Sequence, residues 1–333
     1  MKAAILSSGS RGNSVLIQTD NTKILIDLGV TKSYAEEKLK ELGVDPNEIK
    51  AILITHTHVD HVQGLKVFLK KYHPKLYVNK IILALLREYI DDFDYVLYDT
   101  PSFDIDDITV DVIKTSHDVK GSVGFIIKNK DKSLVYITDT GYINNRYFEK
   151  LSNHNLYIME SNHDIEMLMN GNYPFHLKKR ILSDKGHLSN SDCAYYLSEF
   201  IGDKTNMIIL AHLSDDNNTY ELALSTVKNV LESKNLNYVL AVVIRYFGGI
   251  KLGAGGLVRA YTNAVSNTIS NEFIIPIKKM LKKRITFDYS YINKVNYILK
   301  ENKITYKEFD KDVIYEFTYE EGNYPKELDN YIK

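Results

Sequence analysis

A dense group of polar, metal-competent side chains directly follows an apolar run in this chain. Residues 52–54 read Ile-Leu-Ile, which predicts a buried strand, and His56, His58, Asp60 and His61 come almost at once. Side chains two apart in an extended chain point the same way, so His56 and His58 can share one cation. Asp60 and His61 lie where the pattern turns toward a helix, and they can face a second cation. Because imidazole and carboxylate are ligands of zinc and manganese-like ions, the segment predicts a metal site.

The same arrangement recurs along the chain. Six β-type runs each end in a polar residue able to bind a metal, namely Asp27, His56, His117, Asp139, Glu160 and His212. In sheets covered by helices, ligands gather at the strand ends on one edge, which would bring these groups together. One ion can then be held by His56, His58, His117 and Asp139, and another by Asp60, His61, Asp139 and His212. Asp139 would bridge ions roughly 3.5–4 Å apart, the spacing of hydrolytic two-metal sites.

Composition limits the class of protein. A chain of 333 residues with 44% hydrophobic and 26% charged residues is typical of a soluble globular protein of one large or two ordinary domains. The net charge of -1 argues against a generally basic nucleic-acid-binding surface. A single cysteine, Cys193, cannot form an internal disulfide, so we expect a reducing cytoplasm. The N-terminus lacks the apolar run of a signal peptide, and no apolar stretch is long enough to cross a membrane.

The metal-binding pattern resembles the metallo-β-lactamase fold family. The family signature matches Thr-His-Thr-His-Val-Asp-His at residues 55–61, and the later family ligands match His117, Asp139 and His212. A closer resemblance, to the WalJ (YycJ) subfamily of bacterial proteins, rests on residues 8–14, 160–164, 180–190 and 212–218. That likeness covers residues 1 to about 232. It implies an αββα sandwich with two divalent metal ions (Zn or Mn) and phosphodiester chemistry like that of an exonuclease degrading duplex DNA from a 5′ end.

The implied chemistry assigns roles to further residues. Two metal ions would activate a shared water for attack on phosphorus, and Asp60 can also steer that nucleophile. His187 and His163 are catalytic candidates for contacting the phosphate or protonating the leaving oxygen. His187 can equally be a loop histidine before the helix predicted from Ser191, whose start resembles a capping motif. Cys193, inside that helix, is expected to pack rather than to react.

Two segments leave their roles open. The segment Ser-Ser-Gly-Ser-Arg-Gly-Asn-Ser at residues 7–14 can bind a phosphate through its backbone amides, or it can be a plain turn between strands. Arg180, with Lys178 and Lys179 beside it, can bind backbone phosphate or form a solvated face. The sequence alone does not choose between these alternatives.

The character of the chain changes after residue 232. A buried strand is predicted at residues 238–244, followed by a glycine-rich run over residues 245–261 and a helix over residues 257–269. A glycine-rich turn before a helix can bind an anion, with Arg245, Lys251 and Arg259 nearby. The densest basic run follows, at Lys278, Lys279, Lys282, Lys283 and Arg284. From Lys283 the pattern predicts strand, helix, strand, strand and a short final helix.

The glycine-rich run resembles the YigZ/IMPACT family, in which a ribosomal-protein-S5-like domain precedes a small ferredoxin-like one. The family is associated with translation or RNA rather than with known catalysis. Its first half is absent here, and the lactamase-like part stands in its place. We therefore expect a fusion of three parts: the metallo-β-lactamase-like domain (1–232), a truncated S5-like segment (233–276) and an incomplete ferredoxin-like α+β domain (277–333).

Three function classes compete. The six strand-end ligands and the subfamily resemblance favour a metal-dependent hydrolase acting as a DNA exonuclease. A hydrolase of a small phosphodiester or thioester would share every metal ligand. A non-enzymatic RNA- or ribosome-binding role would instead depend on residues 245–261. We expect the nuclease.

Overall fold

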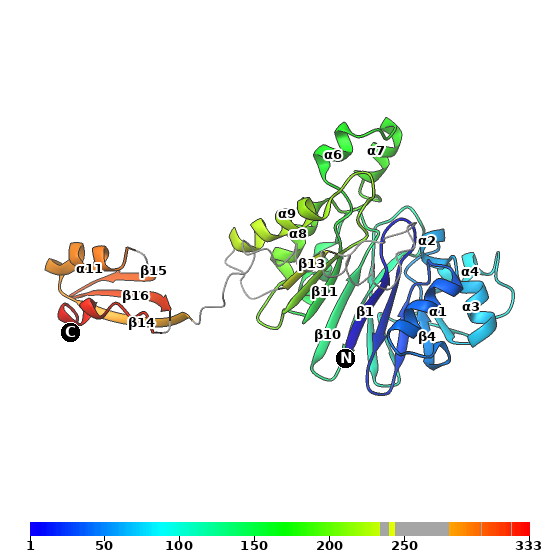
Figure 1. Cartoon of the computed structure of the whole chain (residues 1–333), viewed down its shortest axis with the longest axis horizontal. Helices are drawn as coiled ribbons and strands as arrows, with labels where there is room; N and C mark the ends of the chain where they lie inside the picture. The colour runs from blue at the N-terminus through cyan, green and yellow to red at the C-terminus, as the bar shows by residue number, and fades with distance from the viewer. Residues whose placement is uncertain (234–239, 244–279, 301, 321) are drawn as a thin grey trace, which may run out of the picture. The chain divides into compact units, whose positions relative to one another are not determined.

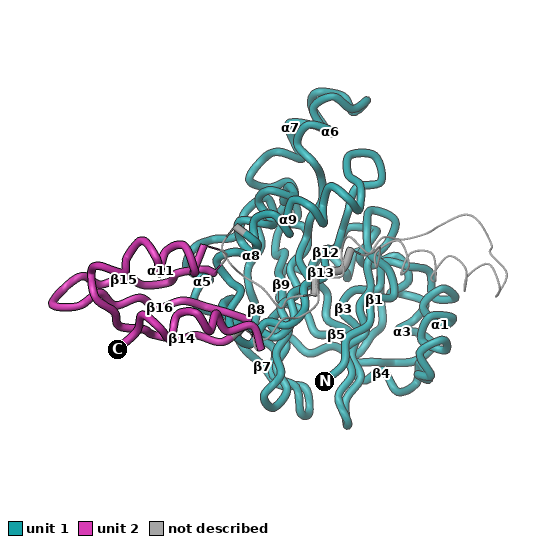
Figure 2. Tube along the Cα trace, turned by 60° about the vertical axis from the view of Figure 1, so that its left-hand side comes forward, with its two compact units in different colours: residues 1–249 teal, residues 250–333 magenta. Residues whose placement is uncertain are grey.

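The computed structural model describes residues 1–233, 240–243, 280–300, 302–320 and 322–333. The chain divides into two compact units, residues 1–249 and 250–333 (Figure 2). The glycine-rich run at 245–261, the helix expected at 257–269 and most of the S5-like segment lie outside the described residues. No helix in the described ranges is long and apolar enough to span a membrane.

Two sheets form the centre of the first unit (Figure 1). The six-stranded sheet runs in chain order through β1 (Lys2–Ser7), β2 (Ser14–Gln18), β3 (Lys23–Ile26), β4 (Ile49–Leu53), β5 (Lys75–Val78) and β6 (Tyr95–Leu97). The seven-stranded sheet has the order β13-β12-β11-β10-β9-β8-β7. Its strands are β7 (Ser102–Ile105), β8 (Ile108–Lys114), β9 (Val123–Asn129), β10 (Lys132–Ile137), β11 (Leu156–Glu160), β12 (Met207–Ala211) and β13 (Leu240–Val243).

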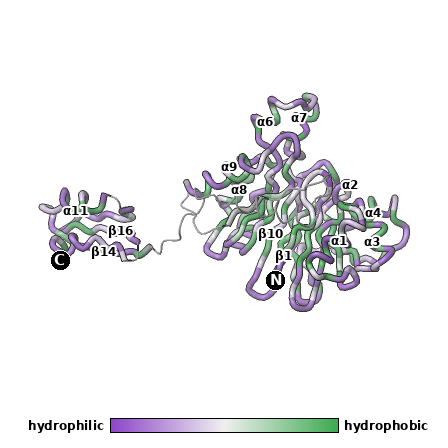
Figure 3. Tube along the Cα trace, viewed as in Figure 1, coloured by the Kyte–Doolittle hydropathy of each residue, from purple (hydrophilic) through white to green (hydrophobic). Residues whose placement is uncertain are grey.

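Helices cover the outer face of each sheet. The first sheet is covered by α1 (Lys32–Glu41), α3 (Leu65–Tyr72) and α4 (Lys80–Leu86), and the second by α8 (Asn190–Phe200) and α9 (Tyr220–Ser233) (Figure 1). The short helix α5 (Phe148–Leu151) packs against α8. One buried cluster joins the first helices to both sheets, and a second lies beneath α8, where Cys193 is fully buried. The strands carry much of the hydrophobic sequence (Figure 3). The expected αββα sandwich is confirmed.

The direction of the strands explains why the predicted ligands meet. In the first sheet β3 and β4 are parallel, and in the second sheet β10, β11 and β12 are parallel. Strands β8 and β10 are both antiparallel to β9 and therefore run in the same direction. The carboxyl ends of six strands thus lie at corresponding edges, where the ligands of α/β sheets gather. Short helix α2 (Val59–Val62) begins at that edge of β4, and α6 (Ile165–Asn170) and α7 (Phe175–Ile181) project beyond the sandwich (Figure 1).

A glycine allows the loop after β3 to lie against α2. The Leu28 N–H donates to the His61 carbonyl at 2.9 Å, and the Gly29 N–H donates to the Asn13 carbonyl at 2.9 Å. A Cβ on Gly29 would lie 1.5 Å from the Asp60 carbonyl oxygen, a separation that backbone atoms cannot accept. Gly29 therefore holds the β3 loop and the metal-competent segment together.

The second unit is a small α+β domain. Its three-stranded antiparallel sheet has the order β14-β16-β15, formed by β14 (Met280–Phe287), β15 (Lys303–Phe309) and β16 (Val313–Glu320). Helix α11 (Ile292–Ile298) and the short helix η4 (Lys326–Asn330) pack on one face around Phe287, Tyr315 and Phe317. The predicted order of strand, helix, strand, strand and short helix is confirmed.

We predict that Gly29→Ala destabilises the fold by more than about 3 kcal/mol, because the new methyl group overlaps backbone. Gly43→Ala is the matched control, since a Cβ at Gly43 meets nothing within 4 Å and only its φ of +69° opposes substitution. That control should lose about 1 kcal/mol. Urea unfolding of both variants measures the difference, and equal losses would contradict the close approach.

Candidate metal centre

Three histidines predicted from the sequence converge after β4 and β8. His58 Nδ1 lies 3.1 Å from His56 Nε2 and 3.3 Å from His117 Nε2. His56 and His117 are buried and His58 is half-buried. Zinc–nitrogen bonds of 2.0–2.1 Å in a tetrahedron place ligand atoms about 3.4 Å apart, so this spacing suits one cation.

A second donor group lies beside the first. Asp60 Oδ2 is 3.6 Å from both His61 Nε2 and His212 Nε2. Asp139 lies between the two groups, with Oδ2 3.1 Å from His61 Nε2 and Oδ1 3.5 Å from His212 Nε2. The same Oδ1 is 3.7 Å from His117 Nε2. The structure therefore brings together all seven residues for which metal binding is expected, and Asp139 lies within 3.7 Å of a histidine from each group.

The donor set fits divalent metal ions. Polar atoms in protein interiors are nearly always paired. His212 Nε2 is buried without a hydrogen-bond partner among the described residues, and the buried Asp139 Oδ2 has only the His61 ring beside it, at 3.1 Å. Clusters of three or four His, Asp and Glu ligand atoms lie within 4.8 Å of one another around them. A cation at this position would satisfy atoms that the protein itself leaves unsatisfied.

The pKa values of two histidines also indicate that the cluster favours a cation. Burial alone would lower the pKa of His61, but Asp27 and Asp139 raise it to about 10. Burial likewise opposes protonation of His212, yet Asp139, Asp60 and Glu160 raise its pKa well above the usual value. The carboxylates thus hold positive charge at these rings, and a metal ion can replace the protons there.

Asp27 orients His61 from behind. This fully buried carboxylate accepts from the Thr55 N–H through Oδ1 and from the Thr55 hydroxyl through Oδ2, each at 2.8 Å. Its Oδ2 also lies 2.8 Å from His61 Nδ1, which turns Nε2 toward Asp60 and Asp139. Desolvation raises the pKa of Asp27 despite His61. Carboxylates in this position fix the tautomer of a ligating histidine.

Glu160 and His187 form a pair on the other side. Glu160 Oε1 lies 2.8 Å from His187 Nδ1 and 2.8 Å from His212 Nδ1. Although burial opposes ionisation, His187 and His212 lower the pKa of Glu160 to about 2, and Glu160 in turn raises the pKa of His187 despite its burial. His187 joins the cluster, while His163 does not. His163 is buried next to Ser189, where desolvation lowers its pKa to about 4.

Two contacts were not singled out from the sequence. Asn13, within the serine- and glycine-rich loop, places Nδ2 3.0 Å from His61 Nε2 and 3.3 Å from Asp60 Oδ2. Asp118 places Oδ1 3.3 Å from His58 Nε2 and 3.4 Å from His117 Nε2. The only indication in the sequence for either residue is that it lies next to motif residues. Polar residues beside metal ligands are too common for that position alone to predict a contact.

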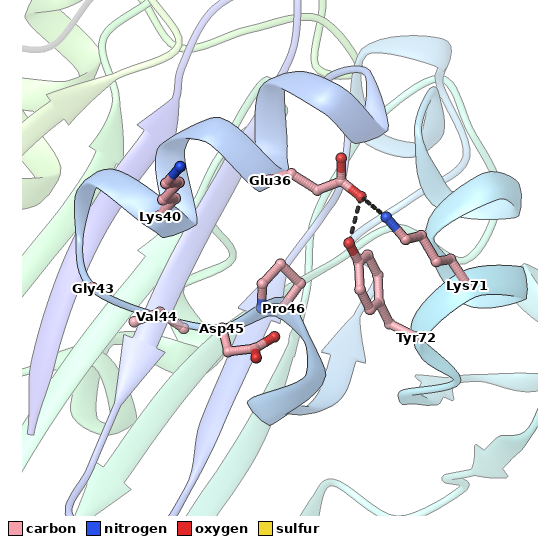
Figure 4. Close-up of a pocket in the computed structure, with 8 residues that line it drawn as sticks. All are labelled: Glu36, Lys40, Gly43, Val44, Asp45, Pro46, Lys71 and Tyr72. Atoms are coloured by element: carbon pink, nitrogen blue, oxygen red, sulfur yellow. Dashed lines mark hydrogen bonds and ion pairs between the residues drawn. The ribbon is translucent and has the colours of Figure 1, made fainter.

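Two basic side chains of α7 make different kinds of contact. Lys178 Nζ donates to the carbonyls of Met169 and Gly171 at 2.7 and 2.8 Å, so it closes the end of α6. Arg180 is instead ion-paired with Asp118. A separate surface groove between α1 and α3 is lined by other residues, with Glu36 bonded to Lys71 and Tyr72 (Figure 4). None of the metal-competent residues lines that groove.

An αββα sandwich with these donors at its strand ends defines a metal-dependent hydrolase. The chain belongs to the metallo-beta-lactamase superfamily, whose family model matches residues 8–212. It is 38% identical over 237 residues to the exodeoxyribonuclease YycJ of Bacillus anthracis, covering 69% of this chain and 89% of that protein. It is also 38% identical over 243 residues to the exodeoxyribonuclease WalJ of Streptococcus pneumoniae, covering 71% and 90%.

A second family matches farther along. The Impact N-terminal domain model matches residues 179–269. The IMPACT family member YvyE of Bacillus subtilis is 42% identical over 79 residues, which are 24% of this chain and 36% of that protein. Among solved structures, the metallo-beta-lactamase fold protein YhfI from Bacillus subtilis superposes with a TM-score of 0.56 at 16% identity, covering 73% of this chain and 95% of YhfI. The last likeness concerns the fold alone.

We predict that Asp27→Asn weakens metal affinity by roughly 10–100-fold, because an amide cannot accept from both Thr55 and His61 as the carboxylate does. Asp106→Asn is the matched control, since Asp106 has a similar φ of 51° but is exposed and pairs with Lys50. Metal content after competition with a chelator measures the effect. Equal metal retention by the two variants would show that Asp27 does not support metal binding.

Proposed function

We propose that this protein is a dinuclear phosphodiesterase that degrades duplex DNA from a 5′ end. The observation that carries the proposal is the pair of donor groups sharing Asp139, found in a chain 38% identical to exodeoxyribonucleases over most of their length. His56, His58, His117 and Asp139 would hold one ion, and Asp60, His61, Asp139 and His212 the other. Zinc and manganese both suit this histidine and carboxylate set.

The protein side chains then have distinct tasks. When bound, the two ions supply Lewis acidity and a water activated near neutral pH for attack on phosphorus. Asp60 has a partly exposed carboxylate, fixed by Asn13 Nδ2, that can orient the attacking water. His187 holds its Nδ1 against Glu160, which leaves Nε2 to donate a proton to the leaving oxygen. His163 stays a weaker candidate because it lies outside the cluster.

End-labelled DNA provides the direct test. With manganese added, wild-type protein should release nucleotides from the 5′ end of a duplex, and His58→Ala should reduce the rate at least 100-fold because one donor group loses a ligand. Chelation of the metal should abolish release by the wild type. Duplexes labelled at the 5′ or 3′ end report the polarity.

The alternative hydrolase makes a different prediction in the same assay. Intact DNA in the presence of two protein-bound ions, together with turnover of bis(p-nitrophenyl) phosphate or a thioester, would contradict the exonuclease. The shared metal centre would then serve a small molecule. Release from the 3′ end would contradict the polarity alone.

The pH profile tests the Glu160–His187 pair. His187 must be protonated to act as the acid, so its contribution is present below its pKa and is lost as pH rises through it. Because Glu160 raises that pKa, Glu160→Gln should move the falling alkaline limb of kcat/KM to lower pH. Glu166→Gln, at an acidic residue on α6, is the control. If Glu160→Gln retains its metal content and the alkaline limb stays at the same pH, His187 is not the general acid.

The IMPACT-like part supports a second candidate. We propose the division 1–232, 233–276 and 277–333, with RNA or ribosome contact through the last two parts. The 42% identity to YvyE over 79 residues supports the IMPACT family likeness on which this role rests. RNA retention by the full chain after chelation of its metals would support binding independent of catalysis, whereas retention that disappears with the metals would oppose it.

A further inference from the structure

Two arginines, Arg11 and Arg180, each present Nε to an aspartate carboxylate, a contact that the other described arginines do not make. Arg11 Nε lies 3.1 Å from Asp215 Oδ2, and Arg180 Nε lies 2.7 Å from Asp118 Oδ2, with Nη2 of Arg180 also in contact. In the rest of the described chain, Arg87 and Arg146 each lie over a tyrosine ring. Arg284 also lies over a tyrosine ring and pairs with Glu308 through Nη2 at 3.2 Å rather than through Nε. The contrast sets Arg11 and Arg180 apart.

Each of these pairs marks one of the two donor groups. Asp118 follows His117, and its other oxygen faces His58 and His117 at 3.3 and 3.4 Å. Arg180 is therefore one side chain removed from the first donor group.

Arg11 is linked to the second donor group through its neighbours in the chain rather than through a direct contact. Asp215 lies in the loop after His212, and Arg11 lies two residues before Asn13, whose Nδ2 is 3.0 Å from His61 Nε2. Arg180 is thus tied to the first donor group by the contacts of Asp118, and Arg11 to the second by its place in the chain beside Asn13.

The geometry leaves each guanidinium able to bind a further anion. A guanidinium has five N–H donors, and a carboxylate on the Nε edge occupies at most two of them. The arginine side chains are 59% and 56% exposed, whereas their aspartates are 28% and 27% exposed. The carboxylates therefore fix the orientation of the guanidinium groups and leave donors directed to solvent. Exposed ion pairs add little to stability, about 0–1 kcal/mol, so neither pair is needed to hold the fold.

We propose that Arg11 and Arg180 are two phosphate-binding positions that hold a nucleic-acid backbone across the metal cluster, one at each donor group. The planar fork of arginine matches the oxygens of a phosphodiester. A chain of net charge -1 offers no general attraction to DNA, so local contacts of this kind would supply it. This proposal rests on the proposed exonuclease function and adds the residues that position its substrate.

Steady-state kinetics of the metal-loaded protein test the proposal. Arg11→Ala and Arg180→Ala should each raise KM for duplex DNA roughly 10-fold, and the ratio of kcat/KM for DNA to that for bis(p-nitrophenyl) phosphate should fall. The slope of log(kcat/KM) against log salt should decrease by about one for each arginine removed. Arg11→Lys and Arg180→Lys should retain the slope, because the charge remains, and recover part of the affinity.

Arg87→Ala is the matched control, removing one exposed arginine that stacks on Tyr95 away from the cluster, and it should leave KM and the salt slope unchanged. Equal losses on DNA and on the small diester would indicate that the ion pairs only maintain structure, and would overturn the proposal. Wild-type KM and salt slope in both alanine variants would overturn it as well. A wild-type protein that hydrolyses the small diester but not DNA would overturn this proposal together with the exonuclease function.

Discussion

The site depends on one topological constraint, which is that strands from both sheets run in a common direction where they carry ligands. Parallel pairing of β3 with β4, and of β10, β11 and β12, places the carboxyl ends at shared edges. Donors far apart in the chain, such as His56 and His212, therefore converge at that edge. The cost is a buried group of imidazoles and carboxylates. Asp27 and Glu160 reduce that cost because each contacts the Nδ1 atom of a histidine in the cluster. Asp27 contacts Nδ1 of His61, and Glu160 contacts Nδ1 of His212.

Much of this centre could be predicted from the sequence because strand periodicity and strand ends are local properties. All six strand-end residues lie where their runs predicted, and the αββα fold followed from the motif resemblance. The orienting contacts could not be predicted in the same way. Asn13 and Asp118 act through approaches between loops distant in sequence, which depend on backbone positions such as the Gly29 contact with Asp60. His163 shows the converse, since a histidine in a plausible motif is buried outside the cluster.

The two family resemblances meet within one sheet. The family models overlap over residues 179–212, and α9 covers the region where the resemblance changes. Strand β13, from the later part, pairs in parallel with β12 and so extends the hydrolase sheet. Residues 240–243 therefore continue the backbone hydrogen bonding of the first unit. A sequence boundary between families need not coincide with a boundary between folded units.

The backbone itself restricts which side chains the site can carry. Asp27, Asp139 and His212 adopt φ values of 59°, 54° and 55°, in the left-handed region that aspartate, asparagine and histidine tolerate better than β-branched residues do. At these three positions few residue types fit the backbone conformation without strain, whatever the chemistry of their side chains. The backbone conformation of these turns thus limits which substitutions the protein tolerates there. It favours exchange among small polar residues, so a shift in metal preference can arise at these positions more readily than a conversion to an apolar surface.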